Sequence, residues 1–245
     1  MREQLILQLS LIKDGISIEN YINELIVKVK IASTANLSQW KKHSSGVVSK
    51  IEPNWSNKVI AIGASTGGTE AILTILRALP RNMPGIVIVQ HMPPVFTKIY
   101  AQRLNNLVAL NVKEAQTGDI VQQGSVLIAP GDKHMKIEKL GSTYRVVCYE
   151  GEKVNGHCPS VDVLFNSVAK KVGKDAIGVI LTGMGYDGAK GLLSMKRSGA
   201  KTIGQDEKSS VIYGMPRVAF NLGAVDKQVS LDSIPQVICS FLDEG

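Results

Sequence analysis

Short apolar runs alternate with amphipathic segments along most of the chain, from residue 58 onward. The apolar runs are rich in aliphatic residues, as buried parallel strands are, and they cover Val59–Gly63, Gly85–Gln90, Ser125–Ala129, Ala176–Leu181 and Lys201–Gly204. The amphipathic segments have the apolar spacing of helices, and they cover Glu70–Leu79, Pro94–Asn105, Val161–Val172, Ala189–Ser198 and Pro216–Asn221. This alternation predicts an α/β fold with a doubly wound, mainly parallel sheet and helices on both faces.

The stretch Lys136–Tyr149 departs from this alternation, because two strand-like runs in it are separated by Gly141-Ser142. A two-residue connection that begins with glycine suits a tight antiparallel turn. We therefore expect a small β-hairpin in addition to the parallel sheet.

The first 57 residues follow another pattern. Residues 1–32 contain one stretch of helical spacing, with apolar residues at positions 18, 22, 25, 26 and 29, whereas residues 33–57 are mostly polar. We expect a lone helix within 1–32, a linker over 33–57 and the main α/β domain over 58–245.

Composition narrows the class of protein. Of the 245 residues, 44% are hydrophobic, which is enough for a packed core. No apolar run approaches the ~20 residues that span a bilayer, and the N-terminus is too polar for a signal peptide. The three cysteines, Cys148, Cys158 and Cys239, lack metal or redox spacing and are odd in number, which suits the reducing cytoplasm. We expect a soluble cytoplasmic protein.

The formal net charge of +7 raises the question of nucleic-acid binding. The lysines and arginines are scattered, and aromatic residues do not alternate with them as stacking platforms would require. The charge therefore predicts a solvated basic surface and no nucleic-acid partner, with attraction to an acidic protein as the weaker alternative.

A glycine-flanked serine stands between the first predicted strand and the first predicted helix, in Gly63-Ala64-Ser65-Thr66-Gly67-Gly68. Ligands of open α/β sheets bind at the carboxyl ends of the strands, so this turn is a candidate site. Dinucleotide binding fits poorly, because Ser65 replaces the glycine that lets a pyrophosphate approach and no acidic residue ends the next strand. A P-loop is excluded, because no Gly-Lys-Ser or Gly-Lys-Thr follows.

Nucleophilic catalysis is the third possibility. Gly63-x-Ser65-x-Gly67 has the spacing of a nucleophile elbow, and the free N–H groups at the start of the next helix can stabilise an oxyanion. The structural alternative is that Ser65 only caps that helix, and on this motif alone capping is favoured.

A catalytic serine needs a base and a group that orients the base. Of the four histidines, His91 follows a predicted strand at the edge where Ser65 lies, whereas His43, His134 and His157 do not. Asp187 lies in a glycine-rich loop after another strand of the same edge, although it can also be a cap for the helix that begins near Ala189. The resulting order Ser, His, Asp differs from that of α/β-hydrolases.

Several further motifs accompany these residues in a fixed order. They are Gln90-His91-Met92-Pro93, Ala129-Pro130-Gly131-Asp132-Lys133-His134-Met135, Pro159-Ser160-Val161-Asp162, Leu181-Thr182-Gly183-Met184-Gly185-Tyr186-Asp187-Gly188 and Gly214-Met215-Pro216-Arg217. Together with the serine turn they resemble the catalytic domain of the CheB family of chemotaxis protein-glutamate methylesterases, over about residues 58–242.

The resemblance implies a function and a set of roles. The family hydrolyses glutamate γ-methyl esters on the cytoplasmic helices of methyl-accepting chemotaxis receptors, releasing methanol, and many members deamidate receptor glutamines. Ser65 is then the nucleophile, His91 the general base and Asp187 its orienting carboxylate, and the backbone N–H groups of Thr66 and Met184 form the oxyanion hole. No metal or organic cofactor is implied. We expect a monomer that meets membrane receptors only through their cytoplasmic part.

This chain departs from the family pattern in two places. Cys158 stands where many members have arginine, which affects substrate affinity or preference rather than the chemistry. Residues 16–40 resemble only the last helix of the family's N-terminal receiver domain and the start of its linker, so we expect constitutive activity. The alternative function is that of a binding protein and not an enzyme: a non-catalytic adaptor that docks on receptors. The intact Ser65, His91 and Asp187 argue against this alternative.

Overall fold

The computed structural model describes Trp55 and residues 57–244. The helix expected within 1–32 and nearly all of the linker expected over 33–57 lie outside the described residues. Of the α/β domain expected over 58–245, the structure describes every residue up to 244.

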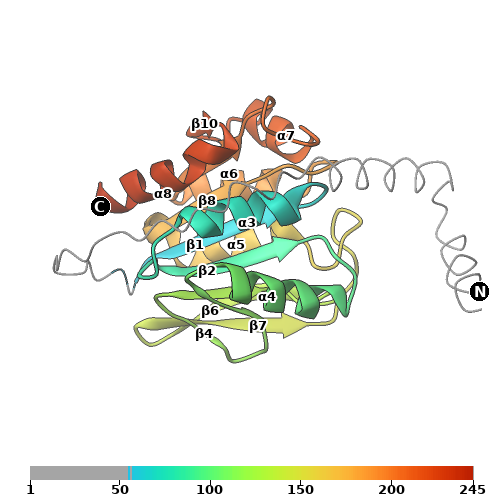
Figure 1. Ribbon diagram of the computed structural model, residues 1–245, viewed down its shortest axis with the longest axis vertical. Coiled ribbons are helices and arrows are strands. Elements are labelled where there is room, and N and C mark those ends of the chain that lie inside the picture. The colour runs from blue at the N-terminus through green and yellow to red at the C-terminus, as the bar shows by residue number, and fades with distance from the viewer. Residues whose placement is uncertain (1–54, 56, 245) are drawn as a thin grey trace, which may run out of the picture. The chain divides into compact units, whose positions relative to one another are not determined.

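Seven parallel strands form the main sheet, in the order β10-β9-β8-β1-β2-β5-β3 (Figure 1). In chain order they are β1 (Val59–Ala64), β2 (Gly85–Gln90), β3 (Asn111–Glu114), β5 (Ser125–Ile128), β8 (Ala176–Ile180), β9 (Lys201–Gln205) and β10 (Lys227–Val229). A second, antiparallel sheet has the order β4-β7-β6, with β4 (Ile120–Val121), β6 (His134–Leu140) and β7 (Thr143–Tyr149).

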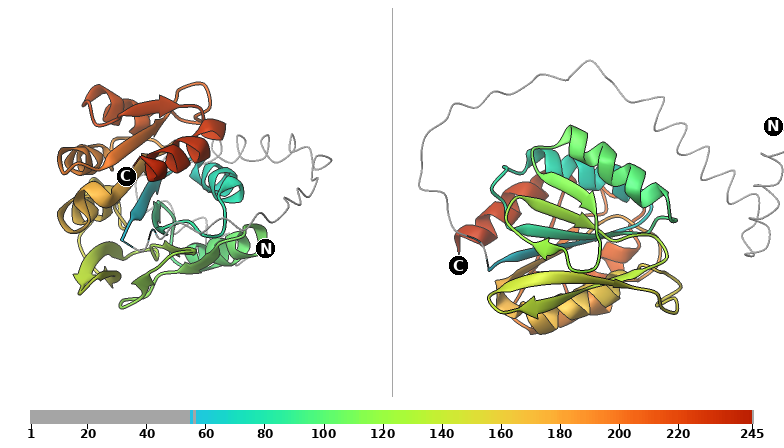
Figure 2. Two further views of the ribbon diagram at one scale, coloured as in Figure 1. Left: turned by 90° about the vertical axis from the view of Figure 1, so that its left-hand side faces the viewer. Right: turned by 90° about the horizontal axis from the view of Figure 1, so that it is seen from below.

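Helices cover both faces of the main sheet (Figure 2). Those on one face are α3 (Gly68–Ala78), α4 (Phe96–Leu107) and α8 (Ile234–Asp243), and those on the other are α5 (Val161–Lys171), α6 (Ala189–Arg197) and α7 (Met215–Asn221). Two short 3-10 helices, Gly173–Asp175 and Leu231–Ser233, complete the described elements. Every residue of β1 and β2 is buried, which explains why these strands read as continuous apolar runs rather than alternating ones.

The doubly wound α/β fold predicted from the sequence is confirmed. All five predicted strands and all five predicted helices are present, with ends displaced by at most about two residues, as is usual for helix boundaries. The predicted hairpin is also present, with Leu140 opposite Thr143 across the Gly141-Ser142 turn. None of the described helices is long and apolar enough to cross a membrane.

Three strands and one helix of the structure are not predicted from the sequence. Strands β3 and β10 lie at the two edges of the main sheet and are short and partly exposed, so they lack the apolar run that marks the central strands. Strand β4 has only two residues, too few for any alternation. The helix α8 was not assigned, although it buries Ile234, Ile238, Phe241 and Leu242 against the sheet.

The strand order changes direction at β1. Strands β2, β5 and β3 lie on one side of it, and β8, β9 and β10 lie on the other. Ala64 at the end of β1 is paired with Gln90 at the end of β2, so the next residues of the two strands are neighbours. This register places Ser65 beside His91 at the carboxyl edge, where open α/β sheets bind ligands.

The helix α5 approaches β1 so closely that Gly63 has no space for a side chain. A Cβ atom built on Gly63 would lie 2.2 Å from Cγ1 of Val161. We expect Gly63→Ala to lower the free energy of unfolding by roughly 1–3 kcal/mol through overpacking. Because Val161→Ala removes the methyl groups in conflict, the double variant should be less destabilised than the sum of the two single variants.

Urea unfolding of the wild type, both single variants and the double variant measures this coupling. Additive effects would show that the close approach of α5 to β1 does not limit the residue at position 63.

Candidate active site

Ser65 is the first residue after β1, and the main chain fixes its position. Its N–H donates to the carbonyl of Thr182 at 3.0 Å, and its carbonyl accepts from the N–H of Gly68 at 2.8 Å. The N-cap of α3 is Gly67, with φ of 80°, and no side chain caps this helix. The structural alternative that Ser65 serves as a helix cap is therefore wrong, which leaves its hydroxyl group available.

The side chain of Gln90 connects the two strand ends that carry Ser65 and His91. This side chain is 3% exposed, and its Nε2 donates to the carbonyls of Ser65 at 2.9 Å and His91 at 3.1 Å. A side chain on Gly68 would collide with Oε1 of the same amide, at 2.2 Å. Gln90 thus holds the backbones of both residues in one arrangement.

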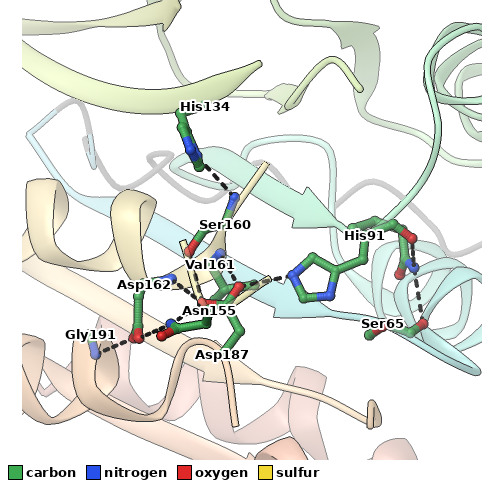
Figure 3. A network of polar contacts seen from close by, with 10 residues as sticks. Ser65, His91, His134, Asn155, Ser160, Val161, Asp162, Asp187 and Gly191 are labelled. Atoms are coloured by element: carbon green, nitrogen blue, oxygen red, sulfur yellow. Dashed lines mark hydrogen bonds and ion pairs between the residues drawn. The ribbon is translucent and has the colours of Figure 1, made fainter. Parts of the chain in front are cut away.

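His91 and Asp187 form a buried pair. Nε2 of His91 lies 2.9 Å from Oδ2 of Asp187, and their side chains are only 8% and 1% exposed. Figure 3 shows the imidazole of His91 directed toward Asp187, with Ser65 on its other side. Within the described part of the chain, Nδ1 of His91 is buried and has no hydrogen-bond partner, and Oγ of Ser65 forms no hydrogen bond to the imidazole. Nε2–H donates to the carboxylate, so Nδ1 is the nitrogen that can accept a proton.

Asp187 receives hydrogen bonds from several elements besides His91 (Figure 3). Its Oδ1 accepts from Asn155 Nδ2 at 2.8 Å and from Ser160 Oγ at 2.7 Å. The N–H groups of Val161 and Asp162, at the start of α5, donate to its two oxygens at 2.6 and 3.3 Å. The N-cap of α6 is Gly188, and no side chain caps that helix. Asp187 therefore binds the N-terminus of α5 and is not the cap of the helix that follows it.

These donors determine the ionisation of Asp187. Burial alone would raise the pKa of this carboxyl group, but hydrogen bonds from His91, Asn155, Ser160 and the Val161 N–H lower it from 3.8 to about 2. The neighbouring Asp162 shares the amide of Asn155 at 2.7 Å, and burial is the main cause that raises its pKa. Asp187 is consequently ionised near neutral pH.

The loop after β8 packs directly against the serine turn. A Cβ atom on Gly183 would lie 2.8 Å from Cβ of Ser65, so only glycine permits this approach. Thr182 Oγ1 donates to the carbonyl of Thr66 at 3.0 Å. Within residues 57–244, the backbone N–H groups of Thr66 and Met184 donate no hydrogen bond. They remain available as donors beside Ser65.

The remaining histidines of the described chain have different surroundings. His134 is 2% exposed; it accepts from the N–H of Ser160 and contacts the carbonyl of Glu152, so its role is structural. His157 lies with its ring stacked on that of His91, at 3.7 Å between centroids. Neither histidine is predicted as a site residue from the sequence, and the structure places the ring of His157 against that of His91.

Three further residues of the candidate site, Gln90, Asn155 and Ser160, are not predicted from the sequence. Asn155-Gly156 is a strong signal for a two-residue turn, but nothing local shows that this turn reaches Asp187. Cys158 lies nearby and is free and partly buried, and burial, followed by Asp132, raises its thiol pKa. Within Trp55 and 57–244, no three His, Cys, Asp or Glu side chains gather as they would around a metal ion.

Comparisons with known proteins identify the family of this chain. The family model described as CheB methylesterase matches residues 60–238. A protein-glutamate methylesterase/protein-glutamine glutaminase of Syntrophomonas wolfei is 52% identical over 232 residues, which are 93% of this chain and 67% of that protein. The protein of that name from Escherichia coli K12 is 49% identical over 225 residues, 91% of this chain and 64% of the relative. The chain thus spans about two thirds of the length of these relatives.

A solved structure is similar as well. The crystal structure of the Thermotoga maritima CheB methylesterase catalytic domain superimposes with a TM-score of 0.73 at 38% identity, covering 75% of this chain and 97% of that domain. The family match, the close relatives and the shared fold show that this chain belongs to the CheB methylesterase family of hydrolases.

Proposed function

We propose that this chain hydrolyses glutamate γ-methyl esters on the cytoplasmic helices of chemotaxis receptors and deamidates receptor glutamines at the same site. The observation that carries the proposal is the oriented imidazole of His91. Its Nε2 is bound to Asp187, and its unpartnered Nδ1 lies at the strand end next to Ser65. This is the arrangement of nucleophile, base and orienting acid that acyl transfer requires.

The reaction then has two steps. Oγ of Ser65 attacks the γ-carbonyl carbon while Nδ1 of His91 takes the hydroxyl proton, and the resulting oxyanion accepts hydrogen bonds from the N–H groups of Thr66 and Met184. The imidazolium returns the proton to the leaving oxygen, so methanol departs and a glutamyl ester of Ser65 remains. Water, deprotonated by His91, cleaves that ester to glutamate and restores Ser65. With glutamine as substrate the leaving group is ammonia.

Asp187 acts through His91. Its charge stabilises the imidazolium that forms in each step, and its hydrogen bond to Nε2–H keeps the tautomer that leaves Nδ1 free. The donors around Asp187 keep it ionised, because they hold its pKa at about 2.

The surroundings of the site support a protein substrate. Exposed apolar side chains stand on the segments that follow β2 and β8, at the edge that carries Ser65; they include Val95, Phe96, Met184 and Tyr186. Apolar groups gathered in this way are typical of surfaces that contact another macromolecule. All residues of the proposed mechanism come from one chain, which supports action as a monomer, in the cytoplasm where the receptor helices lie.

The nucleophile is tested by Ser65→Ala. We expect methanol release from methyl-labelled receptor membranes to fall by about 10⁴–10⁶-fold, as when other serine hydrolases lose their nucleophile. Ser198→Ala, at an exposed serine beyond α6, is the matched control and should retain full activity. Methanol release that survives Ser65→Ala would contradict the serine mechanism, and none from the wild type would favour the receptor-docking adaptor.

The base is tested by the dependence of the rate on pH. Methanol release should fall as the pH is lowered from 8 to 5, because a protonated imidazole cannot accept the serine proton. Asp187 stays ionised over this range and does not contribute to the fall. Circular dichroism at each pH verifies that the protein stays folded, and a flat rate would argue against His91 as the base.

Asp187 should also affect stability. Its pKa is lower in the folded chain than the ordinary 3.8, so the stabilisation is complete above about pH 4 and is lost as the pH falls toward 2. The shift corresponds to about 2 kcal/mol. We expect the difference in unfolding free energy between wild type and Asp187→Asn to be greatest near neutral pH and to narrow below pH 4. A difference that is constant from pH 7 to pH 3 would refute the assigned ionisation.

A further inference from the structure

A tight turn after the β6–β7 hairpin contacts both members of the His91–Asp187 pair. Val154 and His157 exchange two backbone hydrogen bonds of 3.0 Å, which closes a two-residue turn. Its central residues, Asn155 and Gly156, have φ of 53° and 83°. Asn-Gly is the sequence that tolerates positive φ at both central positions of such a turn. The turn is therefore a defined structure that fixes the directions of its side chains.

The ring of His157 covers one face of His91. The two centroids are 3.7 Å apart and the planes differ by 10°. Within the described residues, no hydrogen bond is formed by either ring nitrogen of His157. Its contact with the base is therefore made by the face of the ring.

This contact supplies a restraint that the carboxylate cannot give. The hydrogen bond from Nε2 to Asp187 holds one point of the His91 ring but leaves it able to tilt about that point. A parallel ring against its face fixes the plane, and with it the direction of Nδ1. From the same turn, Asn155 donates to Oδ1 of Asp187 at 2.8 Å.

We propose that the Val154–His157 turn positions the catalytic pair, with His157 as the positioning residue that holds the plane of His91 for proton transfer from Ser65. This inference rests on the proposed function, because it assigns a task to His157 within the same mechanism. Misalignment of reacting groups by about 1 Å can lower a rate by as much as 10²-fold, so a ring that fixes the base has a measurable effect.

The electrostatic surroundings agree with a neutral stacking ring. Burial is the largest cause that lowers the pKa of His157, and the charge that His91 can carry lowers it further. Asp187 acts in the opposite direction, and Lys153 adds to the lowering. His157 thus acquires a proton less readily than a free imidazole does.

The experiment compares kcat and KM for methanol release in His157→Ala, His157→Phe and Glu152→Ala. We expect His157→Ala to lower kcat by about 10-fold with KM within about 2-fold, because the ring acts on proton transfer rather than on receptor binding. Phenylalanine keeps a flat ring at this position without its nitrogens, so His157→Phe should recover most of kcat. The side chain of Glu152 is exposed just before the turn, so Glu152→Ala should behave as the wild type.

The outcomes separate the two proposals. No methanol release from the wild type would contradict the proposed function itself. Wild-type release with an unchanged kcat in His157→Ala, or a loss that phenylalanine does not recover, would overturn the positioning role. Thermal unfolding of each variant shows whether a loss of activity reflects a loss of folding. If His157→Ala is unfolded, the kcat of His157→Phe tests the positioning role instead. A kcat of His157→Phe about 10-fold below that of the wild type would then overturn the proposal.

Discussion

Burying an ionised carboxylate is unfavourable unless donors replace the water that it loses, and Asp187 is only 1% exposed. The donors come from segments far apart in the sequence: the end of β2, the turn that contains Asn155, and the first turn of α5. The N-terminus of α5 adds the favourable end of its helix dipole. Satisfying this one group therefore requires all three segments to converge, and their convergence is what builds the active-site edge.

Close packing of neighbouring residues against two glycines is the second requirement. Gly63 lies against Val161 of α5, and Gly183 lies against Ser65, with no space for a side chain at either glycine. The loops after β1 and β8 are thereby held in contact. The N–H groups of Thr66 and Met184, which belong to these two loops, donate no hydrogen bond within the described residues, and in the proposed mechanism they bind the oxyanion.

The sequence predicts the parts of this arrangement that have a local cause. Central strands appear as apolar runs. Ser65, His91 and Asp187 stand out because each is a polar residue that follows such a run, at the edge of the sheet where ligands bind. The ring of His157 against His91 and the amide of Asn155 on Asp187 are tertiary contacts between segments more than 30 residues apart, without any periodic or spacing signal. Edge strands were missed for the related reason that partial exposure removes their apolar pattern.

The register of β1 and β2 also explains which imidazole nitrogen faces which partner. Ala64 pairs with Gln90, and His91 N–H donates to the carbonyl of Ala64 at 3.1 Å, so the backbones of Ser65 and His91 are immediate neighbours. In a histidine side chain Nδ1 is nearer to the main chain than Nε2. A histidine on the adjacent strand end can therefore present its near nitrogen to the serine in the proposed mechanism, while its far nitrogen extends across the edge to Asp187. The choice of nitrogen in the proposed mechanism thus follows from two parallel strands that end at the same level.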